Sequence, residues 1–237
     1  MDEAFGKTDE GLSLFSSAVN YIYGGGGIVT NFFSIDADTS RIYMAATAED
    51  AADGTEDGRS ELGAIYALDL VDDGKGRFEF QVLNRKTFQG GTGSTPALSA
   101  DGHRLYVSDN HGHVIALDTE LAEVWRLDVG EPLVGSITVS ADNNELYAVT
   151  ASDVIQLIDN GDHGSRAWTA ELAGFDGYAN VDVQSNGLTA TATANGVVIM
   201  IGGGKKLLGK TLMLHVGMGL LDRETGKLRY FTEGRED

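Results

Sequence analysis

Cysteine is absent from the 237-residue chain. No disulfide framework, thiol nucleophile or thiolate metal site can therefore form. A chain without thiols suits an oxidising periplasm and a reducing cytosol alike, because the use of disulfides is what separates the two compartments. The lack of cysteine thus excludes several kinds of chemistry and leaves the location open.

Basic residues are scarce: 17 lysines and arginines stand against 36 aspartates and glutamates, which gives a formal net charge of −19. Nucleic-acid binding depends on Lys and Arg that neutralise phosphates, and anionic membrane surfaces also attract basic segments. The charge therefore argues against both kinds of partner. It favours solubility, would repel acidic substrates and would attract cations.

Long apolar stretches are missing as well. The apolar runs of the chain are far shorter than the roughly 20 residues of a membrane-spanning helix. Residues 1–11, MDEAFGKTDEG, contain neither a basic start nor an apolar core, so no signal peptide is predicted there. The location stays unknown on this evidence.

No catalytic constellation stands out. The sequence contains no nucleophile elbow, no H-E-x-x-H pair and no Ser/His/Asp set in a recognised context. Carboxylates are so common in this acidic chain that the choice of any one pair would be arbitrary. We therefore predict no catalytic residue, no cofactor-binding residue and no bound cofactor.

What the sequence does contain is a repeat. Residues 99–106, SADGHRLY, match residues 140–147, SADNNELY, at an offset of 41 residues. Residues 36–43, DADTSRIY, fit the same template, and residues 184–189 give a weaker fourth copy. Each copy is followed by an apolar-Asp pair and, seven to nine residues later, by an aromatic residue. The pairs are Leu68-Asp69, Leu117-Asp118, Ile158-Asp159 and Leu221-Asp222, and the aromatics are Phe78, Trp125, Trp168 and Tyr230.

Each unit predicts four short antiparallel strands. In the second copy, residues 97–99 and 104–108 flank an Asp-Gly turn, and residues 104–108 alternate with a strand's period. Residues 114–117, VIAL, form an apolar run typical of a strand buried on both faces, and residues 124–127 supply an outer strand. Four strands at a spacing near 41 residues are typical of a β-propeller blade.

The consensus resembles that of the PQQ-repeat, or quinoprotein-like, β-propellers. The matching residues are Asp101-Gly102, Leu105-Tyr106-Val107, Ala116-Leu117-Asp118, Trp125, Ala67-Leu68-Asp69 and residues 221–228. The resemblance covers residues 27–237 and implies a ring of seven or eight blades and a bacterial, extracytoplasmic location, periplasmic or extracellular. It specifies the fold well and the function poorly, because one fold hosts many activities.

We expect an all-β chain with about four blades, at approximately residues 27–90, 91–135, 136–180 and 181–237. Four blades of this type should form an open arc, a part of a larger ring whose missing blades come from the rest of a longer chain. Residues 1–26 form an N-terminal segment. Within it, residues 12–23 are either the outer strand of a preceding blade or a divergent cap.

Two stretches invite a metal-binding interpretation. The insert at residues 48–62 carries six carboxylates, which are ligands that Ca²⁺ prefers. Their spacing does not follow the calcium-loop pattern, so a solvated loop is favoured. His111 and His113 flank Gly112 and would need a third converging ligand. Because no other copy of the repeat contains this pair, an ordinary turn is favoured, and a metal site is left unknown.

Residues 204–211, GKKLLGKT, satisfy the pattern of a phosphate-binding loop. An NTPase of that kind also needs a sheet and an acidic Mg²⁺ residue, and only 26 residues follow Thr211. Residues 197–201 are expected at the third-strand position of the fourth copy. We therefore interpret residues 202–210 as a basic, glycine-rich hairpin insert, with helix and strand both open for residues 211–221.

The leading functional hypothesis is a non-catalytic propeller that binds a protein or a small ligand on the face with the two inserts. The alternative, implied by the resemblance, is part of a quinoprotein dehydrogenase that depends on PQQ and calcium, and these cofactors are expected only in that case. Asp118 and Asp159 occupy the structural apolar-Asp position, and Trp125 and Trp168 the blade-docking aromatic position. No catalytic role is therefore transferred to them.

Overall fold

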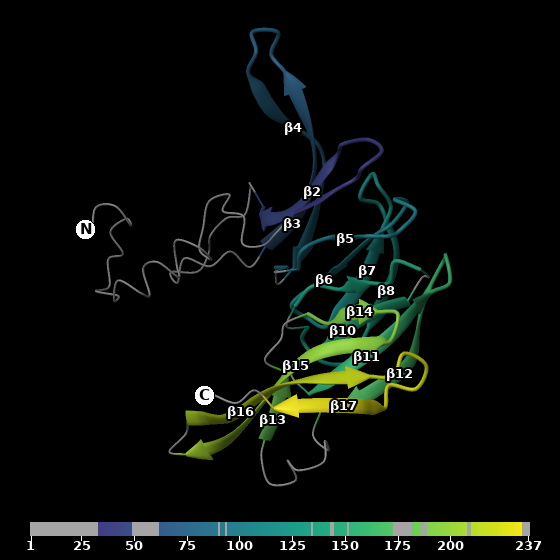
Figure 1. The fold of residues 1–237 in the computed structure, drawn as a ribbon. Coiled ribbons are helices and arrows are strands. Elements are labelled where there is room, and N and C mark those ends of the chain that lie inside the picture. Colours follow the sequence, from purple (N-terminus) through teal and green to yellow (C-terminus); the bar gives the residue numbers. More distant parts are fainter. Residues whose placement is uncertain are drawn as a thin grey trace, which may run out of the picture.

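The computed structural model describes residues 33–48, 62–89, 91–92, 94–133, 135–142, 145–150, 152–172, 182–185, 189–207 and 210–233. The secondary-structure elements of these residues are all β-strands, and neighbouring strands pair antiparallel. They form four sheets that follow one another in chain order (Figure 1). The predictions for residues 1–26 and for residues 49–61 of the acidic insert lie outside the described part of the chain.

The first three sheets have four strands each. The first contains β1 (Phe33–Ile35), β2 (Ile42–Thr47), β3 (Leu62–Asp72) and β4 (Phe78–Gln89). The second contains β5 (Ala97–Leu98), β6 (Leu105–Ser108), β7 (His113–Leu117) and β8 (Glu123–Asp128). The third contains β9 (Thr138–Val139), β10 (Glu145–Val149), β11 (Asp153–Asp159) and β12 (Gly164–Glu171).

The fourth sheet is larger. Its long strands are β15 (Gly196–Leu207), β16 (Lys210–Leu221) and β17 (Leu228–Glu233). Two short strands, β13 (Asp182–Ser185) and β14 (Thr191–Thr193), pair with successive parts of the free edge of β15. The prediction of strand or helix for residues 211–221 is thereby decided in favour of a strand.

The repeat of the sequence is a repeat of the structure. Tyr43 pairs with Ala67, Tyr106 with Ala116, and Tyr147 with the corresponding residue of β11. The three tyrosines therefore occupy equivalent places in the second strands of their sheets. The predicted all-β architecture of about four antiparallel blades is confirmed.

Successive sheets pack face to face through apolar cores. The inner strands β1, β5, β9 and β14 lie side by side. Between the first and second sheets, Ile65 and Leu117 are fully buried; between the second and third, Leu146 and Leu157 are fully buried. Each such side chain contributes about 1.5–3 kcal/mol when it leaves water. The alternation of side chains along each strand places one set on each side of a sheet, so every inner sheet serves two cores.

The stack of sheets does not close into a ring in the described part of the chain (Figure 1). The leading face, which is the side of the first sheet away from the second, exposes six apolar side chains: Phe33, Ile35, Leu70, Phe78, Phe80 and Val82. The trailing face, which is the side of the fourth sheet away from the third, exposes Met200, Met218 and Tyr230. The predicted open arc is therefore present, with apolar surface at both ends.

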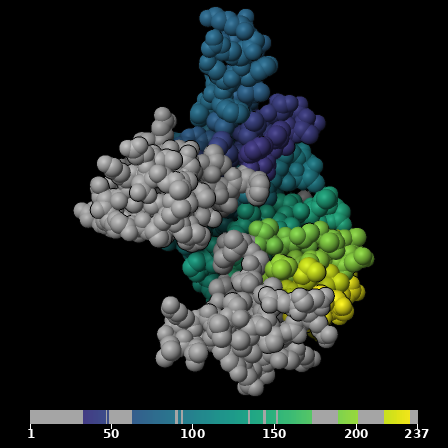
Figure 2. All heavy atoms as spheres, turned by 60° about the vertical axis from the view of Figure 1, so that its left-hand side comes forward, coloured from purple at the N-terminus to yellow at the C-terminus, as the bar shows by residue number. Residues whose placement is uncertain are grey.

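The first sheet departs from the sequence prediction at its third and fourth strands. The third strands of the other sheets end at the apolar-Asp pair, but β3 passes Leu68-Asp69 and runs on to Asp72, and the chain turns at residues 73–77. The aromatic position belongs to Asn84, which pairs with Ala67 beside the bulge, as Trp125 does with Ala116. Phe78 lies at the end of a long hairpin instead, with 64% of its surface exposed. This β3–β4 hairpin, coloured blue, projects from the body in Figure 2.

The fourth copy of the repeat was placed wrongly. Residues 197–201 were expected in a third strand, but β15 is the second strand, between the β13/β14 edge and β16. Ala192 pairs with Val197 as Leu98 pairs with Leu105, so residues 193–197, TANGV, are the true fourth copy. Two residues are missing from its turn, and this deletion hid it.

The phosphate-loop pattern at residues 204–211 is part of a hairpin. Strand β15 continues through residues 204–207 and pairs with β16 as far as Leu207 and Lys210. A phosphate-binding loop would need this backbone to leave the sheet and open a helix. The interpretation of residues 202–210 as a hairpin insert is confirmed.

Candidate functional site

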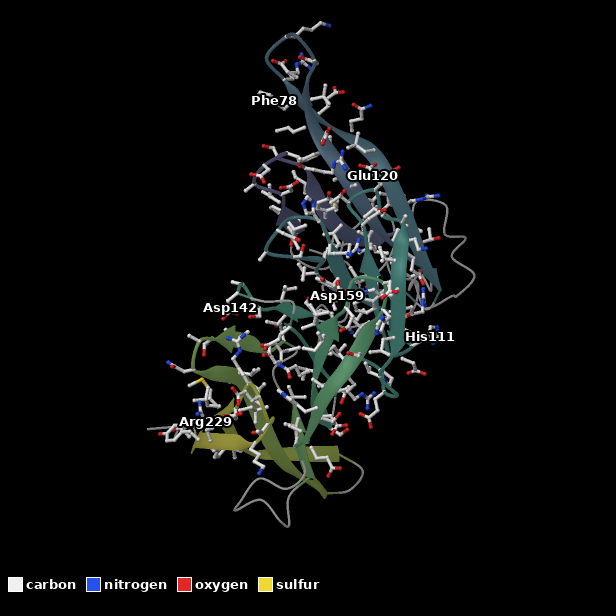
Figure 3. The ribbon with its side chains drawn as sticks, turned by 90° about the vertical axis from the view of Figure 1, so that its right-hand side faces the viewer. Phe78, His111, Glu120, Asp142, Asp159 and Arg229 are labelled. Carbon is white, nitrogen blue, oxygen red and sulfur yellow. The ribbon has the colours of Figure 1, made fainter. Side chains whose placement is uncertain are left out.

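Asp159 joins the second and third sheets (Figure 3). Its carboxylate is 8% exposed and accepts hydrogen bonds from the Tyr106 hydroxyl at 2.6 Å and from Trp125 Nε1 at 2.9 Å. It also accepts the backbone N–H of Gly161 at 2.7 Å. Burial, and then the bond to Asp159, raises the pKa of Tyr106 far above its usual value. The buried carboxylate is thus held by two side chains of the neighbouring sheet.

Trp168 makes the equivalent contact between the third and fourth sheets. Its Nε1 donates to the backbone carbonyl of Arg223 at 2.8 Å. Its ring lies against Gly226, where an added Cβ would stand 2.6 Å from the ring. The Tyr147 ring is 6.0 Å from that of Trp168, and burial raises the Tyr147 pKa to about 12. We call such a contact between successive sheets a latch.

Arg223 adds ion pairs to the latch between the third and fourth sheets. Its guanidinium binds Asp142 at 2.9 Å and Glu145 at 2.7 Å, both on the third sheet, and donates to the Ser140 hydroxyl at 2.9 Å. Arg223, and then Ser140, holds the pKa of Asp142 far below its usual value. A guanidinium that meets two carboxylates and a hydroxyl makes strong, directional hydrogen bonds.

Arg223→Gln is expected to lower the urea midpoint at pH 7. The folded pKa of Asp142 lies well below the usual 3.8 of an aspartate side chain. The contribution of the pair is therefore fully present above that pH and is lost as pH falls through the folded value. The gap between wild type and variant should stay constant from neutral pH to about pH 4 and shrink below it.

Arg229→Gln is the matched control. Arg229 also pairs with one carboxylate, Asp222, at 3.2 Å, but its side chain is 55% exposed. Exposed pairs contribute little, so its urea midpoint should barely move. Equal losses in the two variants, or a gap for Arg223→Gln that widens in acid, would contradict the assignment.

The first and second sheets are latched by different side chains. Tyr43 donates through its hydroxyl to the backbone carbonyl of Thr119 at 3.2 Å, and Arg41 binds Glu120 at 2.7 Å. Asn84 Nδ2 also donates to Glu120, at 2.6 Å. Every described junction between sheets therefore ends on the turn between the third and fourth strands of the following sheet.

The inner edges of the sheets are linked by hydroxyl groups and backbone. Ser34 Oγ donates to the Pro96 carbonyl, and Thr95 N–H donates to Ser136 Oγ at 2.8 Å. The Ser136 N–H then donates to Thr189 Oγ1 at 3.3 Å. Because Thr95, Ser136 and Thr189 hold the same place in three copies of the repeat, these bonds run from sheet to sheet along the inner edge.

The insert face is the end of the sheets at which the second strands end and the third strands begin, marked by Ala48 and Leu62, residues 109–112, Thr150 and Ser152, and Leu207 and Lys210. Neighbouring strands alternate in direction, so these strand ends share one end of the arc. The β11–β12 turn, with Asp162, lies at the opposite end. The described strand ends that flank both predicted inserts therefore lie on a single face.

His111 and His113 also lie on the insert face, on either side of Gly112. The two oxygens of Asp109 lie 2.9 and 3.0 Å from His113 Nδ1, and Asp109 accepts Arg126 at 3.1 Å. Asp109 is 3% exposed and also accepts the backbone N–H of His111. Asp109 thus organises the turn, and His111 takes part in it through its backbone N–H rather than through its ring. The described residues hold no group of three potential His, Cys, Asp or Glu ligands.

Asp118 differs from Asp159 although both occupy the apolar-Asp position. Its carboxylate accepts the backbone N–H groups of Glu120 and Ala122, within its own turn. The aspartates and tryptophans that a quinoprotein site would use first therefore form turns and latches. Arg223, Asn84 and Asp109 were missed by sequence reasoning, because each depends on a partner distant in sequence or on the shifted register of β4.

The family comparison rests on most of the described sheets. Residues 45–230 match a family model described as outer membrane protein assembly factor BamB, a family of PQQ-like repeats. The chain belongs to this family. The resemblance to PQQ-repeat propellers is thereby confirmed, and no curated protein matches the chain.

Solved structures show the same fold. The β-propeller domain of Myceliophteria thermophila Cps50 (Swd1) aligns with a TM-score of 0.55 and 11% identity, over 88% of this PQQ-like chain and 56% of that one. Saccharomyces cerevisiae Sqt1 aligns with a TM-score of 0.50 and 7% identity, over 84% of this chain and 47% of that one. The chain thus spans about half the length of these proteins. No described helix of the PQQ-like chain is long and apolar enough to cross a membrane.

Proposed function

We propose that the chain is part of a non-catalytic PQQ-like propeller that binds another protein on its insert face. The side chains that would be the first choice for a quinone site are engaged elsewhere. Asp159 accepts Tyr106 and Trp125, and Trp168 donates across the next junction. This use of the consensus residues in latches is the observation that carries the function.

The family description supports a protein partner and an extracytoplasmic location, because it names an assembly factor of outer membrane proteins. The insert face is the surface we assign to the partner. It holds the strand ends that flank both inserts and the turn of His111, whose side chain is exposed. Turns and loops on a rigid scaffold are common places for binding residues.

A photo-crosslinking amino acid at position 111 tests the assignment in the protein's native cells. It should give a discrete crosslinked protein, whereas the same amino acid at position 162 should not. Asp162 is the matched control, because its side chain is 90% exposed but lies at the opposite end of the sheets. Equal crosslinks at both positions, or none at 111, would count against the insert face.

The quinoprotein alternative is tested separately. PQQ and Ca²⁺ are added to the purified chain, and the quinone absorbance is followed through gel filtration. We expect the quinone to elute apart from the protein. Co-elution of one quinone per chain, with loss of the signal after chelation of calcium, would support the dehydrogenase instead.

A further inference from the structure

Two positions meet at every junction between sheets. The latch position is the first residue of the fourth strand to pair after the bulge, and the hairpin position lies four residues earlier. The latch residues of the four sheets are Asn84, Trp125, Trp168 and Tyr230. The hairpin residues are Phe80, Leu121, Gly164 and Gly226. At the second and third junctions the latch residue of one sheet faces the hairpin residue of the next, and at the first junction Asn84 bonds to Glu120, the neighbour of the hairpin residue.

At two junctions an aromatic latch residue meets glycine. A Cβ on Gly164 would lie 2.8 Å from the Trp125 ring, and a Cβ on Gly226 would lie 2.6 Å from the Trp168 ring. Both distances are too short for real side-chain contacts. Glycine is therefore the residue that fits beside these rings.

At the first junction the latch residue is small and the hairpin residue is large. Asn84 occupies the latch position and donates to Glu120, directly before Leu121. Leu121 is 3% exposed in the core between the first and second sheets. Its φ is 65°, in the left-handed region that leucine seldom adopts. Leucine is therefore buried at this position despite an unfavourable backbone conformation.

We propose that a size rule at these two positions determines which sheet can follow which: a large latch residue takes glycine, and a small one takes a large side chain. Leu121 fills the space that tryptophan takes at the other junctions. At the trailing face, Tyr230 is 62% exposed. The rule assigns to this face a further blade with glycine at its hairpin position. It rejects the leading face of a second copy, which offers Phe80.

A residue swap at the first junction tests the rule. Asn84→Trp and Leu121→Gly should each lower the urea midpoint, the first by a clash and the second by a cavity. The double variant should recover most of the loss, because tryptophan fills the space and glycine relieves the φ strain. If the losses of the two single variants simply add, the residues are independent and the rule is wrong.

The reciprocal swap is the matched control at the second junction. Gly164→Leu and Trp125→Asn should each destabilise, and the double variant should again regain stability beyond the sum. The urea midpoint is read by circular dichroism, so that the change in tryptophan content does not affect the signal. Recovery at neither junction would overturn the size rule.

Self-association tests its consequence at the open ends. In sedimentation equilibrium the wild type should associate weakly. Phe80→Gly should associate at least about tenfold more tightly, a difference near 1.4 kcal/mol, because Tyr230 of a second copy then meets glycine. Phe78→Gly, on the same face but away from the hairpin position, should behave as wild type. Equal association of wild type and Phe80→Gly would contradict the assignment.

Discussion

Gly226→Ala is expected to lower the free energy of unfolding by roughly 2–4 kcal/mol. Two effects add. The residue has a φ of +68°, which alanine adopts with strain. The new Cβ would also stand 2.6 Å from the Trp168 ring, which is itself fixed by its bond to the Arg223 carbonyl. Urea denaturation followed by circular dichroism gives the loss directly.

Gly74→Ala separates the two effects. Gly74 has a φ of +74°, and an added Cβ would meet nothing within 4 Å. Only the backbone strain remains, so the loss should be about 1 kcal/mol. If Gly74→Ala costs as much as Gly226→Ala, the contact with Trp168 is not what the glycine protects.

Asp159→Ala should lower the free energy of unfolding by roughly 3–4 kcal/mol, because a lost partner costs about 1–3 kcal/mol for each buried polar group left without one. The Tyr106 hydroxyl and Trp125 Nε1 both bond to this carboxylate. Removing it leaves two donors between packed sheets. The same urea experiment measures the effect.

Asp118→Ala is the matched control, since the sequence gives both aspartates the same place in the repeat. The Asp118 carboxylate bonds to backbone N–H groups of its own turn, and neither of these bonds crosses to another sheet. A loss of about 1 kcal/mol or less is expected, as for an ordinary turn or cap hydrogen bond. Similar losses for both variants would mean that the junction adds nothing to the turn.

The fold was accessible from the sequence because its repeat is carried by local chemistry. Turn residues, a period of two and the tyrosine of the second strand all lie within eight consecutive residues, such as 99–106. The fourth copy was misplaced because two residues are missing from its turn and because Val198 stands where the other copies have tyrosine. Local patterns reveal strands, whereas a deletion hides which place in the sheet each strand takes.

The junctions between sheets could be predicted only in part from the sequence. Trp125 and Trp168 were assigned correctly to blade docking, because the sequence places them seven and nine residues after the aspartate of the apolar-Asp pair. Phe78 was misassigned, because the longer β3–β4 hairpin moves the latch position to Asn84. The ion pairs of Arg223 join residues about 80 positions apart, and no local pattern predicts such partners.

Hydrogen exchange of the two indole N–H groups tests the latches most directly. The chain has only two tryptophans, so two indole signals are expected in a ¹H–¹⁵N spectrum, and Trp125→Phe identifies them. Both N–H groups should exchange far more slowly than in the urea-unfolded chain, because one is bound by Asp159 and the other by the Arg223 carbonyl. Exchange of either indole at the unfolded rate would contradict the account of sheets latched in series.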